Sequence, residues 1–413
     1  MQQVEKDVLE IMKNITNRVA LPGKGNQWIN LADLGGELRK NGIDYGKLGY
    51  DKLTSFLKSL NIVEFYRDLS KTLPVIFIRE SNNTQQSFSS PREQLMNWAF
   101  MGYFPTTFKR LKEMALEEDW GTIQNARGEM VYPTNEKGEE IYPILNNYLT
   151  YTFYKLHKEK KILISPNKEY ASFNTGLVDS RYKPIYALFK KNRDPQKNVK
   201  WYWVDFCIEG EERVGKTLVD QFRDMPPRAH YFNKVSDMLY DTSMGTPSLD
   251  LRHIIIDRVD RLPFEFIQDN APRTFEVKDT NSMSGEERYE YYDSLRQAIE
   301  KDQISQRQMT SRIEDALSIS FERVKWNFKS AIPMYYPKKD KMCLFLPLCL
   351  VKDNRVDVAL VVEKTSSGRY QGATIYKLDW AYKCARLVCR PDSDWLTTAA
   401  TNNKGQNDLD DID

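Results

Sequence analysis

Basic and aromatic residues interleave between Lys155 and Lys200, and their chemistry suits contact with a polyanion. The stretch holds 12 Lys and Arg residues against four Asp and Glu residues, an excess of eight positive charges. Cationic side chains neutralise phosphates and flat rings stack on bases, and a groove for a single nucleic-acid strand needs both. A basic sheet edge guarded by lysines, with its aromatic residues in the core, would show the same composition. The residues that we predict to contact RNA or a nucleotide are Lys168, Asn174, Thr175, Gly176, Arg181, Lys183, Tyr186, Lys190, Lys191 and Arg193.

A polar run inside this stretch, residues 172–177, is predicted to form a turn that holds a phosphate or a ribose. Asn174 and Thr175 offer short polar side chains, and Gly176 lets backbone amides approach a ligand. Arg181 and Lys183 follow closely in the sequence. The plainer interpretation is a β-turn that holds no ligand.

Sequence patterns of familiar enzymes are weak. Gly210–Thr217 fits the spacing of a phosphate-binding P-loop and follows an apolar run, but no succession of parallel βαβ units surrounds it. Asp392 and Asp394 could bind a metal together, although solvated loop carboxylates are more common. The histidines and the five cysteines have no zinc-site spacing, so no metal site is predicted and any cofactor stays unknown.

The first 80 residues show the pattern of a winged helix-turn-helix. Apolar residues recur at helical spacing in three segments, and the period then changes to that of a β-hairpin over residues 62–66 and 75–78. Helices followed by such a hairpin form a winged helix. The net charge of this segment is only +2, which is low for a reader of DNA.

Four short runs of this segment are distinctive: Trp28-Ile29-Asn30-Leu31, Gly49-Tyr50-Asp51-Lys52-Leu53, Phe56-Leu57 and Pro74-Val75. Together they resemble the LOTUS (OST-HTH) domain. The resemblance implies a winged-helix module that binds RNA, and some members of that family also bind helicases. Cations that could meet phosphates on this module are Arg39, Lys40, Lys47, Lys52, Lys58 and Arg67. They could equally form an ordinary solvated surface, and winged helices also serve as protein-binding modules.

The rest of the chain predicts a polar linker over residues 81–94, a larger domain over 95–400 and an acidic disordered tail over 401–413. The larger domain is expected to be mixed α+β with mostly antiparallel strands, so the fold class of the whole chain is α+β. Strands are expected at 170–173, 185–189, 201–208, 342–351, 356–362, 370–378 and 385–390. Ser284 and Glu287 form a capping box that opens a helix.

Residues 168–192 and 370–396 resemble an uncharacterised bacterial domain that is often joined to LOTUS or cold-shock RNA-binding modules. That resemblance implies RNA-binding neighbours and no particular reaction. The sequence has no apolar run of about 18 residues and no signal core, so a cytoplasmic protein without a membrane span is expected.

The function that these patterns favour is RNA binding in a bacterial RNA-processing, RNA-repair or defence system. One alternative is an enzyme that acts on RNA ends or nucleotides. Another is an adaptor that docks a protein partner such as a helicase through the N-terminal module.

Overall fold

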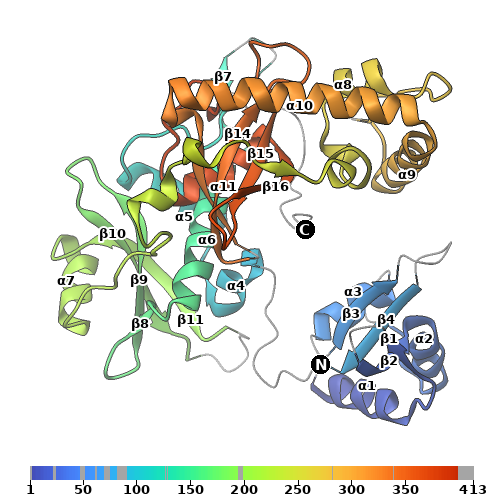
Figure 1. The fold of residues 1–413 in the computed structure, drawn as a ribbon. Coiled ribbons are helices and arrows are strands. Elements are labelled where there is room, and N and C mark those ends of the chain that lie inside the picture. The colour runs from blue at the N-terminus through green and yellow to red at the C-terminus, as the bar shows by residue number, and fades with distance from the viewer. Residues whose placement is uncertain are drawn as a thin grey trace. The chain divides into compact units, whose positions relative to one another are not determined.

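The computed structural model describes residues 2–21, 25–46, 52–60, 63–68, 75–80, 91–125, 127, 129–193, 199–280, 282–337 and 339–398. The chain forms two compact units, Met1–Ser89 and Ser90–Asp413, and each is described by itself (Figure 1). The predicted tail and residues 81–90 of the predicted linker lie outside the described residues. The last linker residues are helical, because α4 (Pro91–Trp98) begins at Pro91.

The N-terminal unit combines helices with a small antiparallel sheet of strand order β1-β2-β4-β3. Its elements are α1 (Gln2–Asn14), β1 (Arg18–Leu21), β2 (Gly25–Asn30), α2 (Leu31–Lys40), α3 (Leu53–Leu60), β3 (Val63–Asp68) and β4 (Val75–Glu80). The predicted winged helix is confirmed, since β3 and β4 form the expected hairpin with Val63 opposite Glu80. The hairpin of β1 and β2 was not predicted.

The core of the N-terminal unit lies between its helices and one face of the sheet. Leu34, Leu38 and Leu57 are fully buried there, at the positions that the helical spacing gives. Trp28 and Phe77 form a separate small cluster. Successive side chains of a strand point to opposite faces of the sheet. Trp28 and Phe77 therefore lie on one face, and Ile29 and Ile78, which follow them in the chain, lie on the other.

The larger unit is built on two five-stranded sheets with the strand orders β5-β11-β10-β9-β8 and β12-β16-β15-β14-β13. The strands of the first sheet are β5 (Ala99–Phe100), β8 (Leu163–Ile164), β9 (Tyr170–Val178), β10 (Pro184–Lys191) and β11 (Trp201–Ile208), and those of the second are β12 (Ser248–Leu249), β13 (Ile332–Tyr336), β14 (Lys341–Leu348), β15 (Val358–Lys364) and β16 (Tyr370–Lys377); β6 (Ile123–Gln124) and β7 (Met130–Val131) pair separately. Antiparallel pairing dominates both sheets, which confirms the predicted α+β class.

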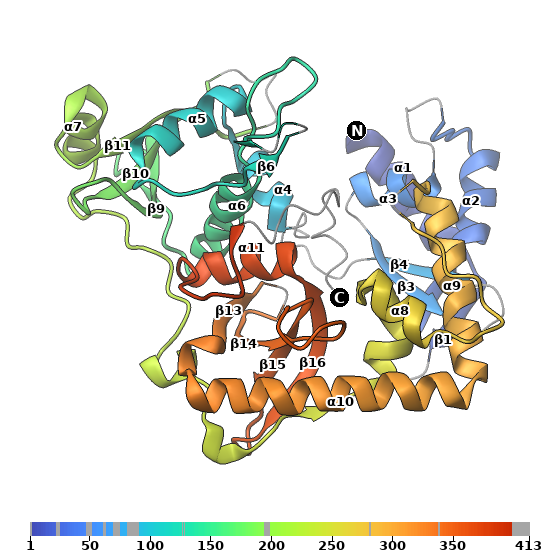
Figure 2. The same ribbon diagram turned by 90° about the horizontal axis from the view of Figure 1, so that it is seen from above.

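The other helices of the larger unit pack against these sheets or against one another. They are α5 (Phe104–Met114), α6 (Pro143–Lys158), α7 (Glu212–Gln221), α8 (Phe264–Asn270), α9 (Gly285–Lys301), α10 (Gln303–Trp326) and α11 (Leu378–Val388), with short segments η1 (Val235–Met238), η2 (Thr242–Met244), η3 (His253–Asp257), η4 (Val259–Arg261) and η5 (Phe328–Ser330). Figure 2 shows the first sheet, α6, α11, the second sheet and α10 in succession. The outer face of the first sheet packs against α7, and α9 begins at the predicted capping box of Ser284 and Glu287.

Burial on both faces explains why the strands of the second sheet read as continuous apolar runs. In β14, Phe345 points into the core that the two sheets share, whereas Leu344 and Leu346 point into the core beneath α10. A strand that faces solvent on one side would alternate apolar and polar residues.

The predicted strand at 385–390 is wrong, because most of these residues belong to α11. Ala381 and Ala385 are buried four residues apart, and Cys384 and Leu387 are buried three residues apart, which is the helical period. A short apolar run alone does not separate a strand from a buried helix.

A buried ion pair joins α11 to the segment that follows α5. Arg386 donates from Nε and Nη2 to the two carboxylate oxygens of Glu118, at 2.6 and 2.8 Å. The guanidinium also lies 4.9 Å from the ring centroid of Trp120 and 4.6 Å from that of Tyr148. Burial alone would lower the pKa of Arg386, but the Glu118 carboxylate raises it above its ordinary value. The guanidinium of Arg386 therefore stays charged inside the shared core.

Arg386→Met should lower the free energy of unfolding by about 3–5 kcal/mol, because Glu118 would keep a buried charge without its partner. The double variant Arg386→Met, Glu118→Leu should recover most of that loss, since an apolar replacement of a whole buried pair is often neutral. Equilibrium denaturation followed by tryptophan fluorescence measures both. A double variant as unstable as the single one would contradict this account of the pair.

Candidate functional site

The predicted phosphate-holding turn lies inside strand β9. Val178 pairs with Pro184 and Asn174 pairs with Tyr186, so residues 175–177 of β9 lie opposite Ile185 alone. This irregularity is a bulge, and Gly176 has a φ of +77° there. A Cβ atom at Gly176 would also lie 2.5 Å from the hydroxyl oxygen of Tyr148. The prediction of a turn is wrong, and the glycine is required by backbone geometry and close packing.

The polar atoms of this bulge bond to the protein backbone. The Asn174 carboxamide accepts a hydrogen bond from the Gly176 amide at 2.8 Å and donates to the carbonyl oxygen of Pro226 at 3.3 Å. The Thr175 hydroxyl donates to the carbonyl oxygen of Ile185 at 2.7 Å. Asn174 is only 8% exposed and Thr175 is fully buried. Their predicted contact with a ligand stays a prediction, and these bonds give both side chains a structural task.

Most aromatic residues of the basic stretch belong to the core. Phe173 and Phe189 are fully buried in the cluster shared by the two sheets, and Tyr186 is 5% exposed beneath α7. Burial raises the pKa of Tyr186 above its ordinary value. The ring of Tyr186, a predicted contact residue, is therefore covered by protein and is not free to stack on a base.

One row of the predicted surface keeps the combination of a cation and rings. Lys190 of β10 pairs with Tyr170 of β9 on one side and with Tyr202 of β11 on the other. All three side chains are partly exposed, and the Lys190 ammonium lies 5.8 Å from the Tyr170 ring centroid. We call these three residues the cross-strand row. Lys168, Lys191 and Arg193 are exposed near the same end of the sheet.

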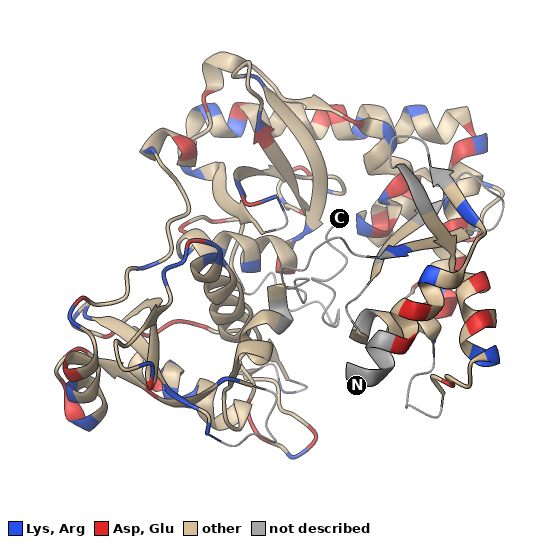
Figure 3. Cartoon of the chain, turned by 90° about the horizontal axis from the view of Figure 1, so that it is seen from below, with Lys and Arg blue, Asp and Glu red and all other residues tan. Residues whose placement is uncertain are grey.

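Acidic residues neutralise part of the predicted basic surface. The guanidinium of Arg181 bonds to Asp179 and Glu211, and Lys183 bonds to the same Glu211 at 2.6 Å. Arg193 donates to Glu169 at 2.6 Å. Figure 3 shows Asp and Glu among the Lys and Arg residues of α7 and α10 as well. Glu169 and Asp179 already enter the excess of eight charges, and Glu211, which lies outside the stretch, neutralises one charge more.

The P-loop pattern at Gly210–Thr217 does not form a phosphate cradle. The helix α7 begins at Glu212, so Gly215, Lys216 and Thr217 lie within its first two turns. The Thr217 hydroxyl donates to the carbonyl oxygen of Arg213. A Cβ atom at Gly215 would lie 2.0 Å from the carbonyl oxygen of Ile208, so close packing explains this glycine.

The cations predicted on the N-terminal unit are only partly described. Arg39, Lys40 and Lys52 are exposed, and Lys40 pairs with Glu37 at 2.7 Å. Lys47 lies outside the described residues, as do the side chains of Lys58 and Arg67. A Cβ atom at Gly35 would lie 2.9 Å from Leu53. Arg39 follows Gly35 by one turn of α2 and Lys52 precedes Leu53, so both cations flank the contact between α2 and α3.

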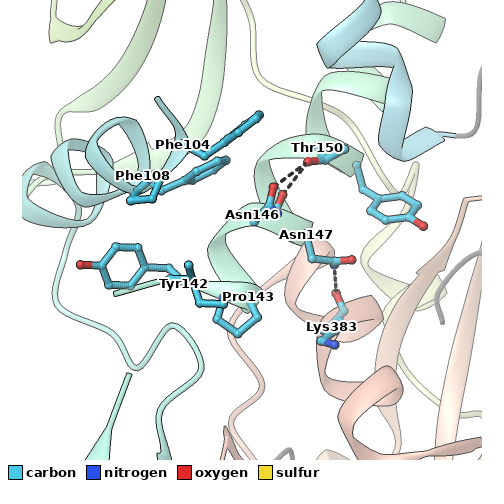
Figure 4. Close-up of a pocket in the computed structure, with 11 residues that line it drawn as sticks. Phe104, Phe108, Tyr142, Pro143, Asn146, Asn147, Thr150 and Lys383 are labelled. Carbon is cyan, nitrogen blue, oxygen red and sulfur yellow. Dashed lines mark hydrogen bonds between the residues drawn. The ribbon is translucent and has the colours of Figure 1, made fainter. Parts of the chain in front are cut away.

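A cavity of about 220 Å³ lies between α5, α6 and α11 (Figure 4). It is lined by Phe104, Pro105, Phe108, Ile141, Tyr142, Pro143, Asn146, Asn147, Thr150, Tyr151 and Lys383. The rings of Phe104 and Phe108 stack with centroids 5.6 Å apart. Among the described residues, the buried Oδ1 atom of Asn147 has no hydrogen-bond partner. Such a cavity suits a small ring system, since pockets for drug-sized ligands measure about 300–1,000 Å³.

Sequence reasoning missed this cavity because its lining residues come from positions 104–151 and from Lys383, with no local motif.

The two carboxylates considered for a metal each pair with a cation instead. Asp392 bonds to Lys329 at 2.7 Å and Asp394 bonds to Arg323 at 2.8 Å. No group of three metal-binding side chains occurs in the part of the chain that the structure describes. Among the described helices, none combines the length and apolarity needed to cross a bilayer.

Asn174→Ala should destabilise the larger unit by about 1–3 kcal/mol, because the Gly176 amide and the Pro226 carbonyl group would lose their partner. RNA affinity per folded molecule should stay at the parent level. Thermal unfolding and RNA titration of the same variant measure both quantities, with Asn354→Ala, an exposed asparagine between β14 and β15, as the control. A folded variant that keeps its stability but loses RNA affinity would contradict the structural role.

Comparison with known families gives two matches. A family model described as the OST-HTH/LOTUS domain matches residues 2–72, so the resemblance inferred for the N-terminal unit is confirmed. A second family model, described as a domain of unknown function (DUF3825), matches residues 111–395. Searches of curated proteins and of solved structures returned no match. Because the second match covers more than half of the sequence, the chain belongs to the DUF3825 family.

Proposed function

We propose that this chain binds RNA, with its N-terminal unit capturing a strand and its larger unit holding the same strand or a nucleotide. The observation that carries the proposal is the OST-HTH/LOTUS match over residues 2–72, because that domain is generally associated with RNA binding. We place the protein in a bacterial RNA-processing, RNA-repair or defence system.

The α2–α3 contact offers a place for the strand on the N-terminal unit. Arg39 lies one turn after Gly35 and Lys52 lies directly before Leu53, and both cations are exposed. The guanidinium group of Arg39 and the ammonium group of Lys52 can bind phosphates of any RNA sequence. Lys40 contributes less, because Glu37 already neutralises it. This unit would thus supply affinity that falls as salt rises.

The cross-strand row offers the place on the larger unit. Tyr170 and Tyr202 lie on either side of Lys190, which puts two partly exposed rings around one cation. Rings stack on bases with little sequence preference, and the cation meets the backbone between them. Lys168, Lys191 and Arg193 would extend the contact along the strand. This arrangement suits a single strand, since a duplex hides the faces of its bases.

LOTUS domains bind proteins as well as RNA in general, so a protein partner such as a helicase is the second candidate for the N-terminal unit. A protein adaptor would hold RNA only through its partner. The two functions therefore differ in whether the purified chain alone retains RNA.

Tyr202→Leu and Arg39→Glu should each weaken the binding of labelled single-stranded RNA to the full chain. Loss of one stacked base costs about 1–3 kcal/mol, which is roughly five- to 150-fold in affinity. Arg39→Glu should also lower the slope of log K against log salt by about 0.7, the value for one phosphate contact of a single strand. Fluorescence anisotropy across a salt series measures both effects.

Two matched controls keep this test specific. Tyr289→Leu changes an exposed ring on α9, and Lys13→Glu reverses an exposed charge on α1. Both controls should bind RNA like the parent. A parent chain that retains no RNA would refute the proposal and favour the protein adaptor.

A further inference from the structure

Two lysine-rich segments that lie far apart in the sequence meet at the end of helix α6. One segment contains Lys155, Lys158 and Lys161, and the other contains Lys339 and Lys341 at the turn between β13 and β14. Asp340 lies at the tip of that turn with a φ of +48°. Its carboxylate accepts a hydrogen bond from Lys155 at 2.7 Å and one from the Tyr335 hydroxyl at 2.6 Å.

These bonds fix the turn against the helix. Burial would raise the pKa of Asp340, but the hydrogen bonds from Lys155 and Tyr335 lower it below its ordinary value. Asp340 therefore remains charged and also lies 3.9 Å from the ammonium of Lys158. Because Asp340 stands between Lys339 and Lys341 in the chain, the same contact brings the backbone of those two lysines close to α6, and their side chains extend to Glu363 of β15.

Three carboxylates hold the five lysines in place without cancelling their charge. Glu159 bonds to Lys155 and Lys161, and Glu363 bonds to Lys339 and Lys341. Together with Asp340, these acids leave an excess of two positive charges. We call this set of eight residues the lysine cluster.

Two cations of the cluster, Lys339 and Lys341, lie nearer to solvent than the carboxylates Glu159 and Glu363, whereas Lys155 is only 11% exposed. The side chains of Glu159 and Glu363 are 18% and 17% exposed, whereas those of Lys339 and Lys341 are 50% and 43% exposed. An ammonium group has three donors, and the bond from each of these lysines to Glu363 uses one of them. The remaining donors can meet the oxygens of an anion from solution.

We propose that the lysine cluster binds a terminal phosphate group, carried by an RNA end or by a free nucleotide. A phosphomonoester has a charge of about −1.5 to −2 at pH 7 and three acceptor oxygens, which matches the excess charge and the outward donors of the cluster. A phosphodiester inside a strand carries only one charge. Binding of a phosphate at an RNA end rests on the proposed function, whereas binding of the phosphate of a free nucleotide does not.

The test compares three labelled single-stranded RNAs of one sequence, with a 5′-phosphate, with a 3′-phosphate or with neither, and titrates AMP separately. The full chain should bind one phosphorylated RNA, or AMP in preference to adenosine, by about tenfold, as charge-assisted bonds do. Lys339→Gln, Lys341→Gln should abolish that preference. The control Lys278→Gln, Lys352→Gln removes two charges elsewhere and should keep it. Lys158→Gln tests the helix side of the cluster independently, and thermal unfolding checks that each variant folds.

The outcomes separate this inference from the function proposed above. A chain that binds no RNA but prefers AMP to adenosine through Lys339 and Lys341 would refute RNA binding and support the cluster. A chain that binds all three RNAs equally and shows no preference for AMP would overturn the cluster while leaving RNA binding in place. A phosphate preference that survives both cluster variants would also overturn it.

Discussion

The ion pair of Arg386 and Glu118 is the constraint around which the larger unit is arranged. It lies in a core shared by two sheets, and both partners have side chains less than about one-eighth exposed. A charge at such a depth is tolerated only when it is paired and its hydrogen bonds are made. The pair therefore requires α11, which follows the second sheet, to pack against the segment after α5 and against Tyr148 of α6. Separating the two sheets would leave a buried charge alone.

Helix α6 carries this constraint to the surface. Tyr148, Thr152 and Lys155 are spaced by four and three residues, so they share one face of the helix, which leads from the buried guanidinium to Asp340 at the turn of β13 and β14. The Thr152 hydroxyl lies 3.4 Å from that of Tyr231 and continues the same polar line. Packing that stabilises the core thus also positions lysines at its edge. The cross-strand row arises similarly, because α7 covers Tyr186 while Tyr170, Lys190 and Tyr202 stay partly exposed.

Sequence reasoning succeeded where a signal is local and failed where tertiary packing decides. The wing hairpin and the capping box at Ser284 depend on neighbouring residues, and both are present as predicted. The run at 385–390 became helix because both a strand and a buried helix satisfy a short apolar pattern. The polar run around Gly176 predicts a turn, whereas the structure has a strand in which the hydroxyl of Tyr148 leaves no room for a side chain at Gly176. The lysine cluster could not be predicted from the sequence, since nearly 180 residues separate Lys161 from Lys339 and each segment alone resembles an ordinary solvated surface.

The proposed function requires that one RNA strand contacts both units of this chain. Photocrosslinking tests it most directly, with a single-stranded RNA that carries 4-thiouridine at every uridine and with crosslinked peptides identified by mass spectrometry. We expect crosslinks in the peptides that contain Arg39 or Lys52 and in those that contain Tyr170 or Tyr202. Crosslinks confined to peptides remote from both places, or the absence of any crosslink to the purified chain, would contradict it.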